Sequence, residues 1–307
     1  MRKLALLFPG QGSQEVGMGK EFYEGSPLAR EMFARADEVL GYQLSKICFE
    51  GPEEDLKLTQ NTQPALLVVS TIAFSLLQKK PAIAAGHSLG EYSALVASGG
   101  LKFEDAVALV HKRGKYMQEA VAVGVGAMAA VLGSRHEDVT VALARVQGGV
   151  AEIANWNSEE QIVIAGHEEA VKEALSLLNP PRSVFLPVSA PFHCRLMISA
   201  EEKLSHDLDD VEFKDLEFPI ITNVDAKVIY RGADARDALK RQVTRPVLWY
   251  KSMEHLQDGD YDYVVELGSG RVLSGLIKRI GRAWTSAPTA LSVSNPESLA
   301  KAQALLS

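Results

Sequence analysis

Short apolar runs alternate along the chain with segments in which apolar residues recur at helical spacing, a pattern typical of an α/β protein. Residues 3–8 are an apolar run that ends at Pro9-Gly10 and predicts a buried strand, and the small residues 82–85 predict a second strand. We place Pro64 at the first position of a long apolar helix, where its missing N–H loses no hydrogen bond. Helices are expected near 29–40, 91–97 and 103–122, and further strand and helix segments near 219–223, 235–244, 250–257, 263–266 and 272–280.

The pattern changes after residue 122 and predicts an inserted unit. Gly124-Val125-Gly126 has the composition of a hinge. The next segments are expected to be strand, helix, strand, strand, helix and strand, at 127–132, 137–146, 150–155, 161–165, 168–178 and 183–188. This βαββαβ order is the ferredoxin-like arrangement. We therefore predict a small subdomain at 124–190, inserted into a larger domain made of 1–123 and 191–307, whose tail holds a surface strand and a final helix.

Composition and charge exclude several classes of protein. The 307 residues are 47% hydrophobic and 23% charged, which excludes disorder and a coiled coil as the main architecture. The net charge of -7 argues against nucleic acid as a partner. The first apolar run is too short for a signal peptide, and the longest one, 65–77, is too short to cross a bilayer. Cys48 and Cys194 have neither metal-ligand nor disulfide spacing, so we expect a cytoplasmic protein.

Gly86-His87-Ser88-Leu89-Gly90 matches the G-x-S-x-G nucleophile elbow, and it lies between a predicted strand and a predicted helix, as that motif requires. The turn presents Ser88 at the helix N-terminus, where the helix dipole and the Leu89 N–H can stabilise an oxyanion. The alternative is a strand–helix turn that uses small residues for packing alone. The context favours Ser88 as a nucleophile.

A serine nucleophile needs a base, and seven histidines are available. Six of them lie on amphipathic helices, begin helices of the small subdomain or neighbour the serine: His111, His206, His255, His136, His167 and His87. The side chain of His87 is expected to point away from the site. His193 remains, in a constrained turn after an apolar strand, with a buried structural histidine as the alternative. No Asp or Glu lies between Leu178 and His193, so a backbone or amide carbonyl is expected to hold the imidazole.

The loop after the first strand, Pro9-Gly10-Gln11-Gly12-Ser13-Gln14, is a second candidate for the site. Its glycines allow close approach of the backbone, so the loop could supply a second oxyanion N–H. A dinucleotide fingerprint is excluded, because G-x-G-x-x-G needs a glycine where this chain has Glu15. A plain tight turn remains the alternative.

Together these segments resemble the bacterial malonyl-CoA:acyl-carrier-protein transacylases, the acyltransferases of fatty-acid synthesis, which are related to the acyltransferase domains of polyketide synthases. The matching blocks occur in the family's order at 8–14, 61–65, 86–92, 113–118, 155–158, 191–194, 241–242 with 246–247, and 266–270. Several independent blocks make the resemblance specific. Trp156 departs from it, because the family usually has another residue between the two asparagines Asn155 and Asn157.

The resemblance implies a hydrolase-like core with a parallel sheet, a ferredoxin-like insertion, and acyl transfer through a malonyl-serine intermediate with no metal or redox cofactor. It implies Ser88 as nucleophile and His193 as base. The N–H groups of Gln11 and Leu89 would form the oxyanion hole.

The resemblance also implies how the acyl group is bound. Arg113 would bind the malonyl carboxylate, Gln63 would line the pocket, and Gln242 would orient His193 through a carbonyl. Arg113 suits this role physically, because a planar guanidinium can bind a desolvated carboxylate through two hydrogen bonds; the alternative is a solvated basic helix face. Phe192 should narrow the pocket, and in polyketide relatives a phenylalanine there accompanies malonyl.

The implied partners are malonyl-CoA and acyl carrier protein, and we expect a monomer with neither nucleic acid nor membrane as a partner. Carrier proteins are acidic, as this chain is, so docking requires a local basic patch. Residues 271–282 contain no Asp or Glu and supply the candidates: Arg271, Lys278, Arg279 and Arg282. The alternative is a solvated helix face.

Other functions stay open at this point. A discrete polyketide-synthase acyltransferase would share the whole site. A serine thioesterase or hydrolase would use the same elbow, with an acid between the serine and the histidine in the sequence and no need for Arg113. A non-catalytic module that binds carrier protein would need neither Ser88 nor His193.

Overall fold

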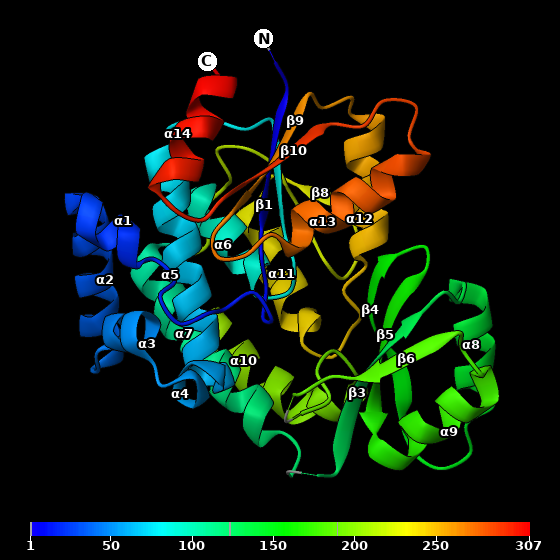
Figure 1. Cartoon of the computed structure of the whole chain (residues 1–307). Helices are drawn as coiled ribbons and strands as arrows, with labels where there is room; N and C mark the ends of the chain where they lie inside the picture. Colours follow the sequence, from blue (N-terminus) through cyan, green and yellow to red (C-terminus); the bar gives the residue numbers. More distant parts are fainter. Residues whose placement is uncertain (1, 123, 189) are drawn as a thin grey trace.

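The computed structural model describes residues 2–122, 124–188 and 190–307. In this part of the chain, six strands form a sheet in the order β10-β9-β1-β2-β7-β8 (Figure 1). Neighbouring strands are parallel except β8, which runs antiparallel to β7. The strands are β1 (Leu4–Phe8), β2 (Ile83–Gly86), β7 (Ile220–Ile221), β8 (Val228–Ile229), β9 (Tyr263–Leu267) and β10 (Thr289–Val293). The predicted α/β core with a mainly parallel sheet is confirmed.

Helices cover both faces of this sheet (Figure 1). The helices of this larger domain are α1 (Lys20–Gly25), α2 (Pro27–Leu40), α3 (Leu44–Glu50), α4 (Glu53–Lys57), α5 (Thr59–Leu77), α6 (Gly90–Ala97), α7 (Phe103–Glu119), α10 (Ile198–Asp209), α11 (Gly232–Gln242), α12 (Trp249–Asp258), α13 (Val272–Ile280) and α14 (Pro296–Leu305), of which α1 to α4 lie farther from the sheet, outside α5 and α7. Among the described residues, no helix combines the length and the apolar character needed to cross a membrane.

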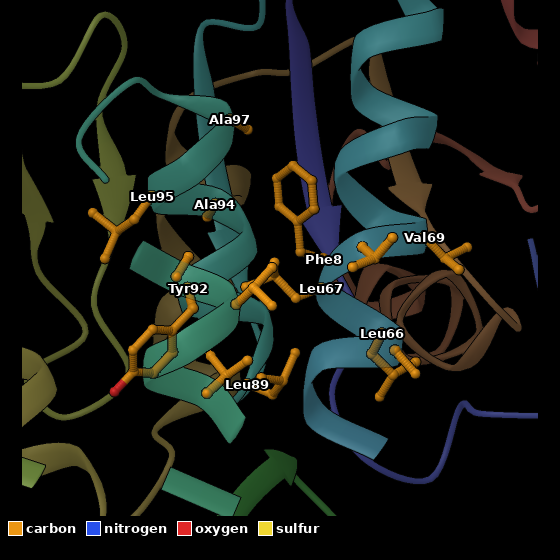
Figure 2. Packing of buried hydrophobic residues seen from close by; sticks show 14 of the residues in the cluster. Phe8, Leu66, Leu67, Val69, Leu89, Tyr92, Ala94, Leu95 and Ala97 are labelled. Carbon is orange, nitrogen blue, oxygen red and sulfur yellow. The ribbon is translucent and has the colours of Figure 1, made fainter. Parts of the chain in front are cut away.

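The side chains of β1 alternate between two apolar cores. Leu6 and Phe8 belong to the core that α5 and α6 cover, and Figure 2 shows Phe8 among the buried side chains of these two helices. Ala5 and Leu7 belong to the core that α12 and α13 cover. Because both faces of the strand are buried, its sequence is an uninterrupted apolar run and not an alternating one.

The predicted insertion forms a second sheet, antiparallel throughout, in the order β4-β5-β3-β6 (Figure 1, green). Its elements are β3 (Gly126–Leu132), α8 (His136–Ala144), β4 (Ala151–Ser158), β5 (Gln161–His167), α9 (Glu168–Leu178) and β6 (Arg182–Phe185). Chain order and strand order together are ferredoxin-like, as predicted. Val123 and Ser189, next to the predicted domain boundaries, lie outside the described residues.

The insertion is joined to the larger domain where β4 pairs with the segment that leads into α12. The Trp156 N–H donates to the Val247 carbonyl, and the Val247 N–H donates to the Ala154 carbonyl, both at 2.9 Å. The insertion is thereby placed beside the carboxyl ends of the parallel strands, which is the edge where α/β proteins bind ligands.

The prediction that Pro64 begins its helix is wrong, because α5 begins at Thr59 and contains the proline. Two tertiary contacts stabilise the additional turn. His111 on α7 places Nδ1 3.0 Å from the Gln60 carbonyl oxygen, which the missing N–H of Pro64 leaves free within the helix. Gly114 lets α7 approach this turn closely, because a Cβ there would lie 2.6 Å from the Thr59 carbonyl oxygen.

Candidate active site

At the elbow, the end of β2, the start of α6 and the end of β1 come so close together that only glycine fits at positions 86 and 90. A Cβ on Gly86 would lie 1.9 Å from the Gly90 carbonyl, and a Cβ on Gly90 would lie 2.0 Å from the Phe8 carbonyl oxygen. Ser88, between them, has a φ of 51°, in the left-handed region that L-residues seldom adopt. The strained turn lifts its side chain above the sheet edge, at the start of α6.

Ser88 Oγ lies 2.7 Å from His193 Nε2. The Nδ1 atom of the same ring lies 2.9 Å from the Gln242 backbone carbonyl oxygen. Since a carbonyl only accepts, Nδ1 carries the proton of the neutral ring, and Nε2 is free to accept the serine proton. Burial, followed by the positive charge of Arg113, lowers the pKa of His193 to about 3. The ring is therefore an unprotonated base at neutral pH.

Arg113 brings a positive charge to the same point. Its side chain comes from α7 and is only 1% exposed. Nη2 donates to Ser88 Oγ at 3.1 Å and to Gln242 Oε1 at 2.9 Å, and Nη1 donates to Gln63 Oε1 at 2.8 Å. All three acceptors are neutral. Among the described residues, therefore, no anion is hydrogen-bonded to this buried, positively charged guanidinium.

Ser88, His193 and Arg113 border a cavity of about 470 Å³ between the two sheets, whereas Gln242 is fully buried and does not line it. Of the residues that the sequence singles out, the following line it: Gln11, Gln63, Ser88, Leu89, Arg113, Phe192 and His193. The Gln11 and Leu89 N–H groups donate to no acceptor within the described residues. Phe192, 6% exposed, lies against the cavity next to His193, whose φ of 60° is also left-handed.

His87 borders the cavity as well, although the sequence suggested that it points away. Its Nε2 lies 2.8 Å from Asn157 Oδ1, and its ring lies 5.3 Å from that of Trp249. Asn155 and Asn157 line the cavity, whereas Trp156 stacks on His136 at 4.1 Å. The Trp156 ring also lies 5.3 Å from that of Tyr250 on α12, so this departure from the family pattern lies between the insertion and α12 and not on the cavity wall.

Sequence reasoning missed a buried polar network beneath the elbow. Asn223 Oδ1 accepts from the Ser88 N–H at 2.6 Å, and Asn223 Nδ2 donates to the Gly86 carbonyl at 2.7 Å. Glu91 Oε2 accepts from the Asn223 N–H at 3.0 Å and from Gln242 Nε2 at 2.8 Å. The signal available in the sequence was the position of Asn223 at the end of the segment 219–223, which could be a neighbour of β2 at the edge that carries the elbow.

The four basic residues proposed as a carrier-protein surface lie outside the cavity. Arg271, Lys278, Arg279 and Arg282 are all exposed, on α13 or just beside it. The same helix reaches the cavity through Val272, Leu273 and Leu276. Arg279 also donates to Gln161 Oε1 of the insertion at 2.6 Å, and Gln161 lines the cavity. The basic residues are therefore close to the cavity rim.

Comparison with known proteins identifies the family of the chain. A family model described as acyl transferase domain matches residues 5–295. The malonyl-CoA acyl-carrier-protein transacylase of Bacillus subtilis is 44% identical over 307 residues, which cover 97% of this chain and 96% of the relative. That of Escherichia coli is 44% identical over 312 residues, covering 98% of this chain and 99% of the relative.

Solved structures give the same result. The transacylase of Coxiella burnetii has a TM-score of 0.95 at 39% identity, covering 99% of this chain and 97% of its own. A malonyl transacylase solved in complex with a holo acyl carrier protein of a type II polyketide synthase has a TM-score of 0.94 at 41% identity, covering 99% of each chain. From the matched family model and these full-length relatives it follows that the chain belongs to the acyl transferase family, as a member of its malonyl-CoA:acyl-carrier-protein transacylases.

Proposed function

We propose that this enzyme transfers the malonyl group of malonyl-CoA to the phosphopantetheine thiol of acyl carrier protein, by a ping-pong mechanism through a malonyl ester of Ser88. One observation carries the proposal. Ser88 Oγ lies within hydrogen-bond distance of both a neutral imidazole, at 2.7 Å, and a buried guanidinium, at 3.1 Å, in one cavity. The first suits a nucleophile and the second suits a substrate with a free carboxylate.

In the first half-reaction, Ser88 Oγ attacks the thioester carbonyl carbon and its proton passes to His193 Nε2. The N–H groups of Gln11 and Leu89 stabilise the oxyanion. The tetrahedral intermediate then collapses, the carbon–sulfur bond breaks, and the CoA sulfur leaves with the proton from His193. The malonyl group remains as an ester of Ser88.

The second half-reaction repeats these steps with a new nucleophile. The carrier thiol gives its proton to His193 Nε2, and its sulfur attacks the ester carbonyl carbon. The bond from that carbon to Ser88 Oγ breaks, and Oγ recovers the proton. Every group required comes from one chain, which supports a monomer as the active unit.

Arg113 selects the acyl group in this proposal. A buried guanidinium with only neutral hydrogen-bond partners can gain a charge-assisted, bidentate bond when a carboxylate arrives. Phe192 covers part of the cavity beside His193, which leaves less room for a branched acyl chain. We therefore assign malonyl, rather than acetyl, as the preferred group.

A thioesterase is the weaker alternative. Hydrolases of this type hold the histidine by a carboxylate, which stabilises the imidazolium, whereas the group at His193 Nδ1 is a neutral carbonyl.

Fatty-acid synthesis is the pathway that we propose. A discrete acyltransferase of polyketide synthesis is the second candidate, because the structurally similar transacylase in complex with a carrier protein serves a polyketide synthase.

The carrier protein is proposed to dock on Arg271, Lys278, Arg279 and Arg282. Their position near the cavity rim supports this assignment, since a pantetheine arm must enter the cavity while the acidic carrier stays outside. Val272 is 50% exposed and lines the cavity, so it adds an apolar contact at the same place.

Intact-mass measurement tests the proposed function. Malonyl-CoA alone should add one malonyl group to the protein, and holo acyl carrier protein should then remove it and gain it. Steady release of CoA without any acceptor thiol would favour a hydrolase, and absence of an adduct would contradict covalent catalysis.

A further inference from the structure

The mechanism gives no task to the buried carboxylate of Glu91. It lies in the first turn of α6, three residues after Ser88, and its exposed fraction is 0%. Oε2 accepts two hydrogen bonds, from the Asn223 N–H at 3.0 Å and from Gln242 Nε2 at 2.8 Å. Burying a carboxylate costs free energy because the group loses its hydration. A carboxylate that is buried next to an active site is therefore expected to have a role there.

Through Asn223 and Gln242, these two bonds connect Glu91 to the three residues of the site. Asn223 holds the Ser88 N–H through Oδ1. Gln242 accepts from Arg113 through Oε1, and its backbone carbonyl is at His193 Nδ1. Glu91 Oε2 is thus the point at which the supports of Ser88, Arg113 and His193 meet.

The side-chain amide of Gln242 has an oxygen, Oε1, that accepts and an NH₂ group, Nε2, that donates. The neighbouring groups determine the orientation of this amide. Arg113 can only donate, so it requires the oxygen end. The carboxylate of Glu91 accepts at Oε2, so it requires the NH₂ end. Without that acceptor, Nε2 keeps only the Ser88 carbonyl at 3.1 Å and a long contact to Asn223 Oδ1 at 3.5 Å. Neither of these would hold the amide as firmly as the Oε2 acceptor at 2.8 Å does.

Protonation of Glu91 does not remove this acceptor. Burial raises the pKa of Glu91 to about 7, so both forms occur near neutral pH. Oε1 is buried and has no hydrogen-bond partner among the described residues, so it can carry the proton while Oε2 keeps both of its bonds.

We propose that Glu91 is a positioning residue for acyl transfer, which fixes the Gln242 amide so that its oxygen holds the Arg113 guanidinium beside Ser88. This inference rests on the proposed function of Arg113. It assigns Glu91 no proton transfer and no contact with substrate. Its role is to keep the charge of Arg113 at the place where the carboxylate of the acyl group must lie.

Two substitutions distinguish the effect of the acceptor oxygen of Glu91 from the effect of its side-chain volume. E91Q keeps an acceptor oxygen at the Oε2 position, and its NH₂ group takes the place of the unpartnered Oε1. E91L keeps a similar volume and removes the acceptor. We expect malonyl kcat/KM within about threefold of wild type for E91Q and a loss of about 10- to 100-fold for E91L, as for other displacements of substrate-positioning groups.

The comparison of two acyl donors distinguishes positioning from general damage. Acetyl-CoA has no carboxylate for Arg113, so E91L should lose much less acetyl transfer than malonyl transfer. E266Q is the matched control, because Glu266 is the other buried glutamate among the described residues and accepts from the Leu273 and Ser274 N–H groups, away from Gln242. E266Q should change stability and leave the malonyl-to-acetyl ratio as in wild type.

A double-mutant cycle tests whether Glu91 acts through Arg113. If it does, E91L added to R113A should lower malonyl transfer by less than twofold beyond R113A alone. Additive losses, or equal losses of malonyl and acetyl transfer in E91L, would overturn the inference. If E91L does not fold, E91D applies the same test, since its shorter carboxylate cannot reach Gln242. Failure of the proposed function is a separate result, in which the wild type forms no malonyl-serine or R113A leaves donor preference unchanged.

Discussion

His193 Nδ1 lies 2.9 Å from the backbone carbonyl oxygen of Gln242, in the place where many serine enzymes have a carboxylate. The carbonyl fixes the tautomer as well as a carboxylate would, but it supplies no negative charge to a protonated ring. Burial and the nearby charge of Arg113 act against protonation too. The base is therefore held in its neutral form over a wide range of pH.

A first prediction concerns the acid limb of the pH profile. The pKa of His193 is lowered to about 3, by burial first and by Arg113 second. For the free enzyme, kcat/KM with malonyl-CoA should stay level from pH 7 down to about pH 5. In R113A, measured with acetyl-CoA, the pKa of His193 should rise and the acid limb should move toward neutral pH. Half-loss of wild-type kcat/KM near pH 6.5, or an unmoved limb in R113A, would contradict this account of the base.

A second prediction links Glu91 to stability. Its folded pKa of about 7 lies above its ordinary value of 4.5, mainly because of burial. The folded protein thus binds the proton more tightly than the unfolded chain, so stability should fall as pH rises from 4.5 to 7, by on the order of 3 kcal/mol. E91Q lacks this titration. Urea unfolding of wild type and E91Q at several pH values gives the difference between their free energies of unfolding. The titration of His193 contributes equally to both proteins and cancels in this difference. A difference that does not vary with pH would exclude the elevated pKa of Glu91.

The third prediction is that S88A forms no acyl-enzyme. Alanine is smaller than serine and enters the left-handed turn with a similar strain, so the fold should be kept. Intact-mass measurement should find no malonyl adduct after incubation with malonyl-CoA, while circular dichroism matches the wild type. A stoichiometric adduct in S88A would place the nucleophile elsewhere.

Fourth, R113A should lose malonyl transfer and retain or gain acetyl transfer. Loss of a buried, charged, bidentate partner costs about 3–5 kcal/mol, which is roughly 150- to 5,000-fold in kcat/KM. Parallel assays with the two CoA thioesters give the ratio. Equal losses for both would assign Arg113 a structural role.

Fifth, charge reversal on α13 should weaken carrier-protein docking alone. K278E/R279E should raise KM for acyl carrier protein, reduce the sensitivity of that KM to salt, and leave self-malonylation unchanged. K79E/K80E is the control, because these residues precede β2 and so lie at the sheet edge opposite Ser88. A folded α13 variant with wild-type KM at low ionic strength would refute the docking surface.

How far the sequence predicts this fold depends on how local the determining forces are. The amphipathic pattern of 168–178 and of 272–280 gives α9 and α13 with their observed bounds, because apolar periodicity specifies a buried face. The beginning of α5 could not be predicted, because Gly114 and His111 on another helix stabilise the turn before Pro64.

The candidate site divides in the same way. The elbow at Ser88 is a local motif, and elimination among the histidines leaves His193. The assignments of Arg113 and Gln242 depend on resemblance, since pattern alone relates neither to Ser88. The Glu91–Asn223 contact joins residues 132 positions apart, and it exists only because β2 and β7 are neighbours in the sheet. The carrier-protein surface remains a prediction.

Gln242 supports the base and the acyl-binding arginine with different parts of itself. Its main-chain carbonyl is at His193, whereas its side-chain oxygen is at Arg113. Any amino acid at this position would still supply the carbonyl, so substitutions here can change the choice of acyl group without dismantling the catalytic dyad. Proton transfer thus depends on the main chain of residue 242, whereas acyl selection depends on its side chain. Position 242 is therefore a natural starting point for the laboratory evolution of new acyl specificities.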